Sequence, residues 1–151
     1  MKIDERFLIE APIDAVWAFV RNPQRVAPCI PGCEAVEPLS DKLYRSTIGV
    51  ALGPIKARFN VVVEITEEFP PNRLLCITKG EEGGKASMIT ATTEIKLEAQ
   101  ETGRTQIRCA SEVSIVGRLG KFGLAIMKKR AAQLANEFAT AVQQRMRTAD
   151  A

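Results

Sequence analysis

The sequence predicts an α+β fold, a curled antiparallel sheet of about seven strands wrapped around a long C-terminal helix, with two short helices after the first strand. Apolar and polar residues alternate almost without a break from Glu34 to Gly117, and turn residues separate the runs. A proline-free segment with helical apolar spacing follows from Arg118 to about Arg145. These patterns indicate a sheet with one face in water and the other covered by the closing helix.

Length and composition are those of one globular domain. The chain has 151 residues, of which 46% are hydrophobic and 26% are charged. We find no internal repeat and no linker-like segment. We therefore expect a single domain that spans residues 1–151.

The first strand and the two short helices occupy the N-terminal quarter. The run from Lys2 to Ile9 reads as a strand, and Ala11-Pro12 opens a helix whose first turn suits proline. A buried helical stripe follows at spacings of three and four, formed by Ile13, Val16, Trp17 and Val20. Asn22-Pro23 ends this helix, and a short second helix or turn leads into the next loop.

The strands that follow each carry one apolar face. Turn residues separate them at Gly53-Pro54, Phe69–Asn72, Glu82–Lys85 and Thr102-Gly103. We expect these residues to face the core: Tyr44, Ser46, Ile48, Val50, Phe59, Val61, Val63, Ile65, Ala91, Thr93, Ile95, Leu97, Ile107, Cys109, Ser111, Val113 and Ile115. The run from Leu74 to Lys79 is also a strand, although its start is apolar on both faces.

The closing helix has more apolar surface than one stripe against the sheet can use. Its main stripe consists of Met127, Ala131, Leu134, Phe138 and Val142. Phe122 and Ile126 project about a quarter turn or more from this line. Glycines at 117, 120 and 123 allow either close packing on the sheet or a flexible gate.

This surplus predicts a cavity between the sheet and the closing helix. We expect it to bind an apolar ligand, and its lining is predicted to include Phe59, Val61, Ile77, Phe122 and Ile126. The strand residues are placed there by alternation and the helix residues by their position beside the main stripe.

The absence of histidine bears on catalysis. It removes the commonest general base and every Ser-His or Cys-His nucleophile pair. No nucleotide-binding glycine motif is present, and the carboxylates lie beside turns or on polar strand faces. We predict no catalytic residue, while Tyr44, Glu94 and Glu112 stay as candidates for a polar dyad in an enzyme.

The four cysteines are expected to be reduced thiols. Cys29 and Cys33 flank Pro31-Gly32 with C-x3-C spacing, but a zinc site normally needs four ligands. Cys76 and Cys109 lie singly in strand-like runs and suit buried apolar positions. We predict that the Cys29–Cys33 loop is structural, shapes one rim of the cavity and binds no metal.

Basic residues concentrate at the C-terminal end. Residues 118–151 contain seven basic and two acidic side chains. We predict that Arg118, Lys121, Lys128 and Lys129 form one side of the closing helix that contacts an anionic membrane or an acidic partner. A plain solvated face is the alternative. Nucleic acid is not expected as a partner, because only 5% of residues are aromatic.

The sequence also predicts a location. It contains no run of 18 or more uncharged apolar residues, and its first residues lack the apolar core of a signal peptide. We expect a cytoplasmic protein, with peripheral contact at the inner face of the membrane left open.

Several of these motifs together resemble one family. Ala-Pro-x-x-x-Val-Trp at the first helix is similar to the START / polyketide-cyclase (helix-grip) superfamily. More narrowly, the chain resembles the G subunit of carbon monoxide dehydrogenase. That resemblance rests on the segments Cys29–Glu34, Gly53-Pro54 with Phe59, Gly117–Gly123, and Glu137-Phe138.

The resemblance implies a non-catalytic accessory role beside a molybdenum hydroxylase of the carbon monoxide dehydrogenase type, in membrane attachment or electron transfer. It implies no tightly bound cofactor, and a quinone or lipid as the ligand. A cyclase or lipid-modifying enzyme of the same fold is the alternative, and a structural adaptor with a filled core is the third.

Overall fold

All strands belong to one antiparallel sheet, in the order β1-β7-β6-β5-β4-β3-β2. The computed structural model describes residues 1–52, 55–101 and 103–150, apart from the side chains of residues 52, 55, 85, 121–124, 127 and 147–150. The strands are β1 (Lys2–Ile9), β2 (Cys33–Ser40), β3 (Leu43–Leu52), β4 (Ile55–Phe69), β5 (Arg73–Glu82), β6 (Ser87–Gln100) and β7 (Arg104–Gly117). Because β1 pairs with β7, the first strand forms one edge of the sheet and β2 forms the other.

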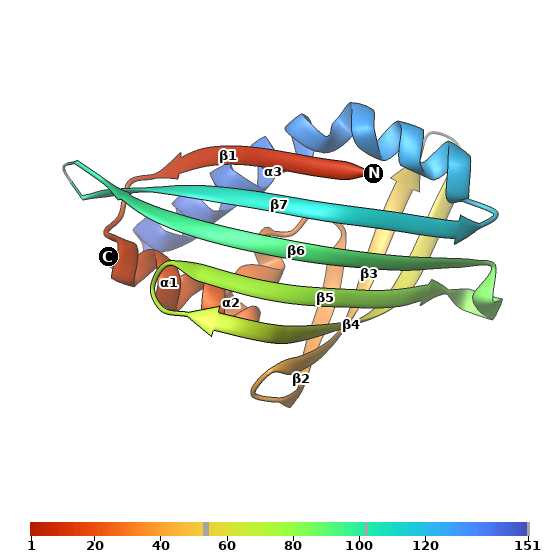
Figure 1. Cartoon of the computed structure of the whole chain (residues 1–151), viewed down its shortest axis with the longest axis horizontal. Helices are drawn as coiled ribbons and strands as arrows, with labels where there is room; N and C mark the ends of the chain where they lie inside the picture. The colour runs from red at the N-terminus through yellow and green to blue at the C-terminus, as the bar shows by residue number, and fades with distance from the viewer. Residues whose placement is uncertain (53–54, 102, 151) are drawn as a thin grey trace.

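Apart from the short turn at Gly83–Lys85, which connects two strands, the helices lie behind the sheet or along its upper edge in the view of Figure 1. They are α1 (Ile13–Arg21), α2 (Pro23–Val26), the 3-10 turns η1 (Ala27–Cys29) and η2 (Gly83–Lys85), and α3 (Gly120–Asp150). Within the described residues, no helix combines the length and the apolar character needed to cross a lipid bilayer. This arrangement confirms the predicted α+β helix-grip fold.

The closing helix begins at Gly120 rather than at Arg118 as predicted. Gly117 has a φ of +100°, a conformation that favours glycine, and turns the chain sharply after β7. The backbone amides of the next two residues then form hydrogen bonds with groups outside the helix. Arg118 donates its backbone N–H to the Ala86 carbonyl, and Leu119 donates its own to the Ser87 hydroxyl.

The pairing of the strands confirms the predicted faces of β3 and β4. Phe59 lies opposite Ile48, and Val61 lies opposite Ser46. Directly opposed residues in an antiparallel pair point to the same side of the sheet, so these side chains share the concave face. Both Phe59 and Val61 are buried.

Among the described residues, the largest buried cluster, here called the solid core, lies at one end of the molecule. It joins α1, the end of α3 and the neighbouring strands, and its fully buried members include Ile9, Val16, Ile107 and Val142. Phe7 of β1 meets Phe138 of α3 edge to face, with ring centroids 5.7 Å apart. At the other end, α3 passes near the end of β3 and the start of β4 (Figure 1). A cavity lies there between α3 and the sheet.

Candidate functional site

An apolar cavity of about 400 Å³ lies between the concave face of the sheet and α3. Its volume falls within the range of small-molecule binding sites. The strands contribute the aliphatic and aromatic side chains of Ile48, Val50, Phe59, Val61, Ile89 and Ile115. Leu119 and Leu134 close it from the side of the helix.

A second apolar compartment of about 280 Å³ adjoins the first. Ile48, Val61 and Thr78 line both compartments. From these shared residues the second compartment extends below α2 and η1 towards Leu74 and Cys76. A ligand longer than the first compartment therefore has further apolar space available.

Two of the five residues predicted to line the cavity do line it, and a third packs beside them without lining it. Phe59 and Val61 line it directly. Ile126 is partly buried against the cluster that contains both of them. The side chain of Phe122 lies outside the described residues.

The prediction for Ile77 is wrong. Ile77 lies opposite Glu64 on β4 and Thr92 on β6, and these residues are on the outer face of the sheet. Its neighbours Cys76 and Thr78 point into the second compartment instead. The strand begins with Leu74, Leu75, Cys76 and Ile77, so alternation alone could not tell one face from the other.

Two charged residues at the cavity were not predicted. Arg130 and Glu137 both line it, and they lie on the α3 face that carries Leu134. The spacing from Arg130 to Leu134 is four residues and from Leu134 to Glu137 three, which places all three on one side of a helix. The sequence contains one signal that indicates these two residues: each is a charged residue at helical spacing from an apolar residue of the stripe that faces the sheet.

The charged groups of the cavity lie along α3. Arg130 donates a hydrogen bond from Nη1 to the backbone carbonyl of Ala51, near the end of β3, at 3.0 Å. Glu137 accepts one from Gln133 Nε2 at 3.4 Å. Among the described lining residues, Arg130 and Glu137 are the only charged ones.

The Cys29–Cys33 loop forms part of the cavity rim. Pro31 and Gly32 line the cavity, and the Gly32 carbonyl accepts a hydrogen bond of 2.7 Å from the Gly49 amide. Gly32 has a φ of +85°, and a Cβ at this position would collide with the Gly49 carbonyl oxygen. This close approach fixes the loop against β3.

The cysteines are free thiols. Burial raises the pKa of both Cys76 and Cys109 to about 11, so these thiols are protonated at neutral pH and are weak nucleophiles. The Cys33 sulfur lies 3.2 Å from the Ser46 hydroxyl. In the part of the chain that the structure describes, no three His, Cys, Asp or Glu residues are grouped to hold a metal ion.

The three candidates for a catalytic dyad are separated. Tyr44 lines the second compartment, but its hydroxyl accepts a hydrogen bond of 3.0 Å from Arg21 and donates one to the Asp41 carbonyl. Glu94 lies on the outer face, where Arg73 hydrogen bonds to it and lowers its pKa. Glu112 is also on the outer face, beside the terminal amino group.

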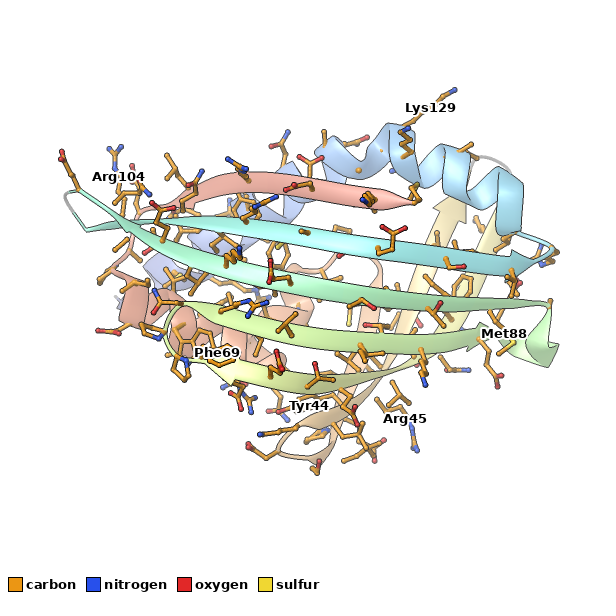
Figure 2. All side chains as sticks on the ribbon, viewed as in Figure 1. Tyr44, Arg45, Phe69, Met88, Arg104 and Lys129 are labelled. Atoms are coloured by element: carbon orange, nitrogen blue, oxygen red, sulfur yellow. The ribbon has the colours of Figure 1, made fainter. Side chains whose placement is uncertain are left out.

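The predicted basic surface is only partly as expected. Arg118 precedes α3 and pairs with Glu82, so its placement on the basic side of the helix is wrong. Lys128 and Lys129 are exposed, and Figure 2 shows Lys129 pointing away from the molecule. The side chain of Lys121 lies outside the described residues.

Comparison with known families identifies one match. The family model for the G subunit of carbon monoxide dehydrogenase (CoxG) matches residues 6–147. No curated protein sequence matches the chain.

Solved structures with the same fold cover nearly the whole chain. A conserved protein from Geobacillus kaustophilus aligns with a TM-score of 0.87 at 19% identity, over 98% of this chain and 96% of that one. A protein from Thermus thermophilus aligns over the full length of both chains, with a TM-score of 0.73 at 13% identity. The Zhui aromatase/cyclase from Streptomyces sp. R1128 aligns over 97% and 93% of the two chains, with a TM-score of 0.68 at 12% identity.

Proposed function

Because the chain belongs to the CoxG family, that of the carbon monoxide dehydrogenase G subunit, we propose that it is an accessory protein that binds an apolar small molecule, quinone or lipid-like, in the cavity beneath α3. Its partner on this proposal is a molybdenum hydroxylase of the carbon monoxide dehydrogenase type. The observation that carries the proposal is the pair of adjoining apolar compartments.

The physical basis for binding is removal of apolar ligand surface from water. Burial of about 250 Å² contributes about 6 kcal/mol at about 25 cal/mol per Å², before the cost of immobilising the ligand. The walls formed by the strands are mostly aliphatic, so they offer a ligand few hydrogen bonds. Such a site selects its ligand by size and apolar character and leaves its covalent structure unchanged.

The cyclase alternative has less support from the site. The similar fold of the Streptomyces enzyme, at 12% identity, carries only the architecture. A cyclase would need polar groups placed to act together inside the cavity, and the three candidates predicted from the sequence are not placed in this way. Tyr44 is held by Arg21 and by the Asp41 backbone, and the carboxylates of Glu94 and Glu112 are on the opposite face of the sheet.

Peripheral contact with an anionic membrane is the second part of the proposal. Lys128 and Lys129 are exposed on the part of α3 that passes the cavity end of the molecule. Each lysine near an anionic surface contributes about 1 kcal/mol, so two give weak and reversible attachment. Such contact would let the protein exchange an apolar ligand with the bilayer.

The binding test uses two tryptophan substitutions on neighbouring residues. Val61 is on the wall shared by both compartments, whereas Val62 is 37% exposed on the outer face. We expect Val61→Trp to weaken binding of a decyl-substituted benzoquinone at least tenfold in calorimetry, because the indole fills the cavity. Val62→Trp should bind as the wild type does.

Both variants must retain the wild-type circular dichroism spectrum and melting behaviour. Equal affinities of the two variants would place the ligand elsewhere. Failure of the wild type to bind any apolar probe would overturn the proposal.

The membrane contact is tested separately by co-sedimentation with anionic and neutral vesicles at low salt. The double variant Lys128→Glu/Lys129→Glu should lose recovery on anionic vesicles, since reversing two charges replaces attraction with repulsion. Equal recovery of the variant and the wild type would rule out these lysines as the contact.

A further inference from the structure

We propose that Arg130 binds the polar end of the ligand at the cavity mouth, so that the ligand is an amphipathic molecule with a neutral oxygen acceptor rather than a plain hydrocarbon. This inference rests on the proposed function and specifies the ligand chemistry that the site selects. It follows from the position of Arg130, from its free hydrogen-bonding capacity and from the neighbouring Glu137.

Arg130 is on the face of α3 that closes the cavity. Ile126, Arg130 and Leu134 follow at intervals of four residues, so their side chains lie on one side of the helix. Ile126 packs on the apolar cluster below, while Arg130 and Leu134 line the cavity. The guanidinium is thus placed where an apolar ligand must present one of its ends.

The guanidinium of Arg130 has unused donors. It carries five N–H groups, and the hydrogen bond to Ala51 uses one of them. Among the described residues, no carboxylate lies within ion-pair distance of Arg130, whereas Arg21, Arg73 and Arg118 each pair with a glutamate. Arg130 can therefore hold the mouth against β3 and still donate to a ligand oxygen.

Glu137 sets the charge of the preferred ligand. It lines the same cavity seven residues after Arg130, which corresponds to a rise of about 10 Å along the helix. A carboxylate ligand would be attracted by Arg130 and repelled by Glu137. A neutral carbonyl gains the hydrogen bond from Arg130 without that repulsion, so carbonyl-bearing molecules should bind better than fatty acids of equal length.

The test compares three probes with apolar chains of nearly the same length and different head groups. They are a decyl-substituted benzoquinone, decylbenzene, which lacks an oxygen acceptor, and decanoate, which is charged. Wild-type protein should bind the quinone about tenfold more tightly than either of the others. Arg130→Met keeps the apolar stem and should lose this preference, so that the affinity for the quinone falls to about that for decylbenzene.

Two further variants separate recognition from structure. Lys129→Met removes an adjacent exposed charge and should bind all three probes as the wild type does. Glu137→Gln removes the repelling charge and should raise the affinity for decanoate several-fold relative to the affinity for the quinone.

The outcomes distinguish this inference from the proposed function. If the wild type binds quinone and decylbenzene equally, or if Arg130→Met weakens both to the same extent, Arg130 has only a structural role and the inference is wrong while the cavity remains a binding site. If the wild type binds none of the probes, the proposed function fails, and the inference fails with it.

Discussion

Arg118, in the turn before α3, donates a bifurcated hydrogen bond from Nε to the two carboxylate oxygens of Glu82, at 2.9 and 3.1 Å, and its Nη2 also pairs with Oε2. Glu82 is at the end of β5 and is only 7% exposed. The pair therefore ties the start of the closing helix to a strand on the far side of β6. It holds in place the part of α3 that approaches the cavity.

The first prediction concerns the pH dependence of this pair. The hydrogen bond from Arg118 lowers the pKa of Glu82 from its ordinary value of 4.5. A lowered carboxyl pKa stabilises the fold above pH 4.5, and that contribution is lost as the pH falls through the folded-state value. Glu82→Gln should therefore lower the urea midpoint at pH 7, and its difference from the wild type should shrink at pH 3.

Glu98→Gln supplies the control, because Glu98 is exposed on β6. It should leave the midpoint unchanged at pH 7. If the deficit of Glu82→Gln were as large at pH 3 as at pH 7, the ionised pair would not be the source of the stability.

The second prediction concerns the rim loop. Gly32→Ala meets both a φ of +85° and a clash between the new Cβ and the Gly49 carbonyl oxygen, so it should destabilise the protein by about 3 kcal/mol. Gly103→Ala has a φ of +70° but open space around it, and should cost only about 1 kcal/mol. Gly83→Ala has neither obstacle and should be neutral.

Chemical denaturation of the three variants measures these differences. The loss of stability in Gly103→Ala measures the cost of the backbone conformation alone. The additional loss in Gly32→Ala measures the cost of the clash with the Gly49 carbonyl oxygen. If Gly32→Ala and Gly103→Ala lost equal stability, the loop would not be fixed against β3.

The fold could be predicted because each strand and the closing helix bury only one side, so that apolar residues recur at regular spacings along the sequence. On β4, Phe59 and Val61 alternate with the exposed Asn60 and Val62, and a sheet with one wet face requires this pattern. Ile77 was misplaced because its strand begins with apolar residues on both faces. The alternation of apolar and polar residues then does not indicate which side chains face the core.

The polar contacts of the site could not be predicted in the same way. Arg118 and Glu82 are 36 residues apart, and Arg130 and Ala51 are 79 apart. From sequence alone, an arginine on a helix is ordinarily predicted to be exposed to solvent. The passage of α3 beside the end of β3 gives Arg130 its position at the cavity.

The third prediction concerns a buried hydroxyl in the solid core. Thr105 is fully buried, and its Oγ1 donates a hydrogen bond of 2.8 Å to the Ala11 carbonyl. Thr105→Val preserves the shape but removes the donor, so it should reduce the free energy of unfolding by about 1–3 kcal/mol. Thr90→Val, on the exposed outer face, should change it by less than about 0.5 kcal/mol. Equal effects would mean that the hydroxyl contributes nothing to stability.

The last prediction uses the thiols as reporters of ligand binding. The pKa of Cys76 and that of Cys109 are both raised to about 11, so at pH 8 only about one thiol in a thousand is a thiolate. Both should therefore react slowly with iodoacetamide at pH 8, and while the protein stays folded their rates should rise about tenfold per pH unit up to about pH 11. Peptide mapping by mass spectrometry follows each residue separately.

The two cysteines should respond differently to an apolar ligand. Cys76 lines the second compartment, whereas Cys109 lies on β7 outside the lining of either compartment that the structure describes. A ligand that extends past Val61 into the second compartment should slow the modification of Cys76 and leave that of Cys109 unchanged. Protection of both thiols to the same extent would indicate general stabilisation of the fold, and protection of neither would confine the ligand to the first compartment.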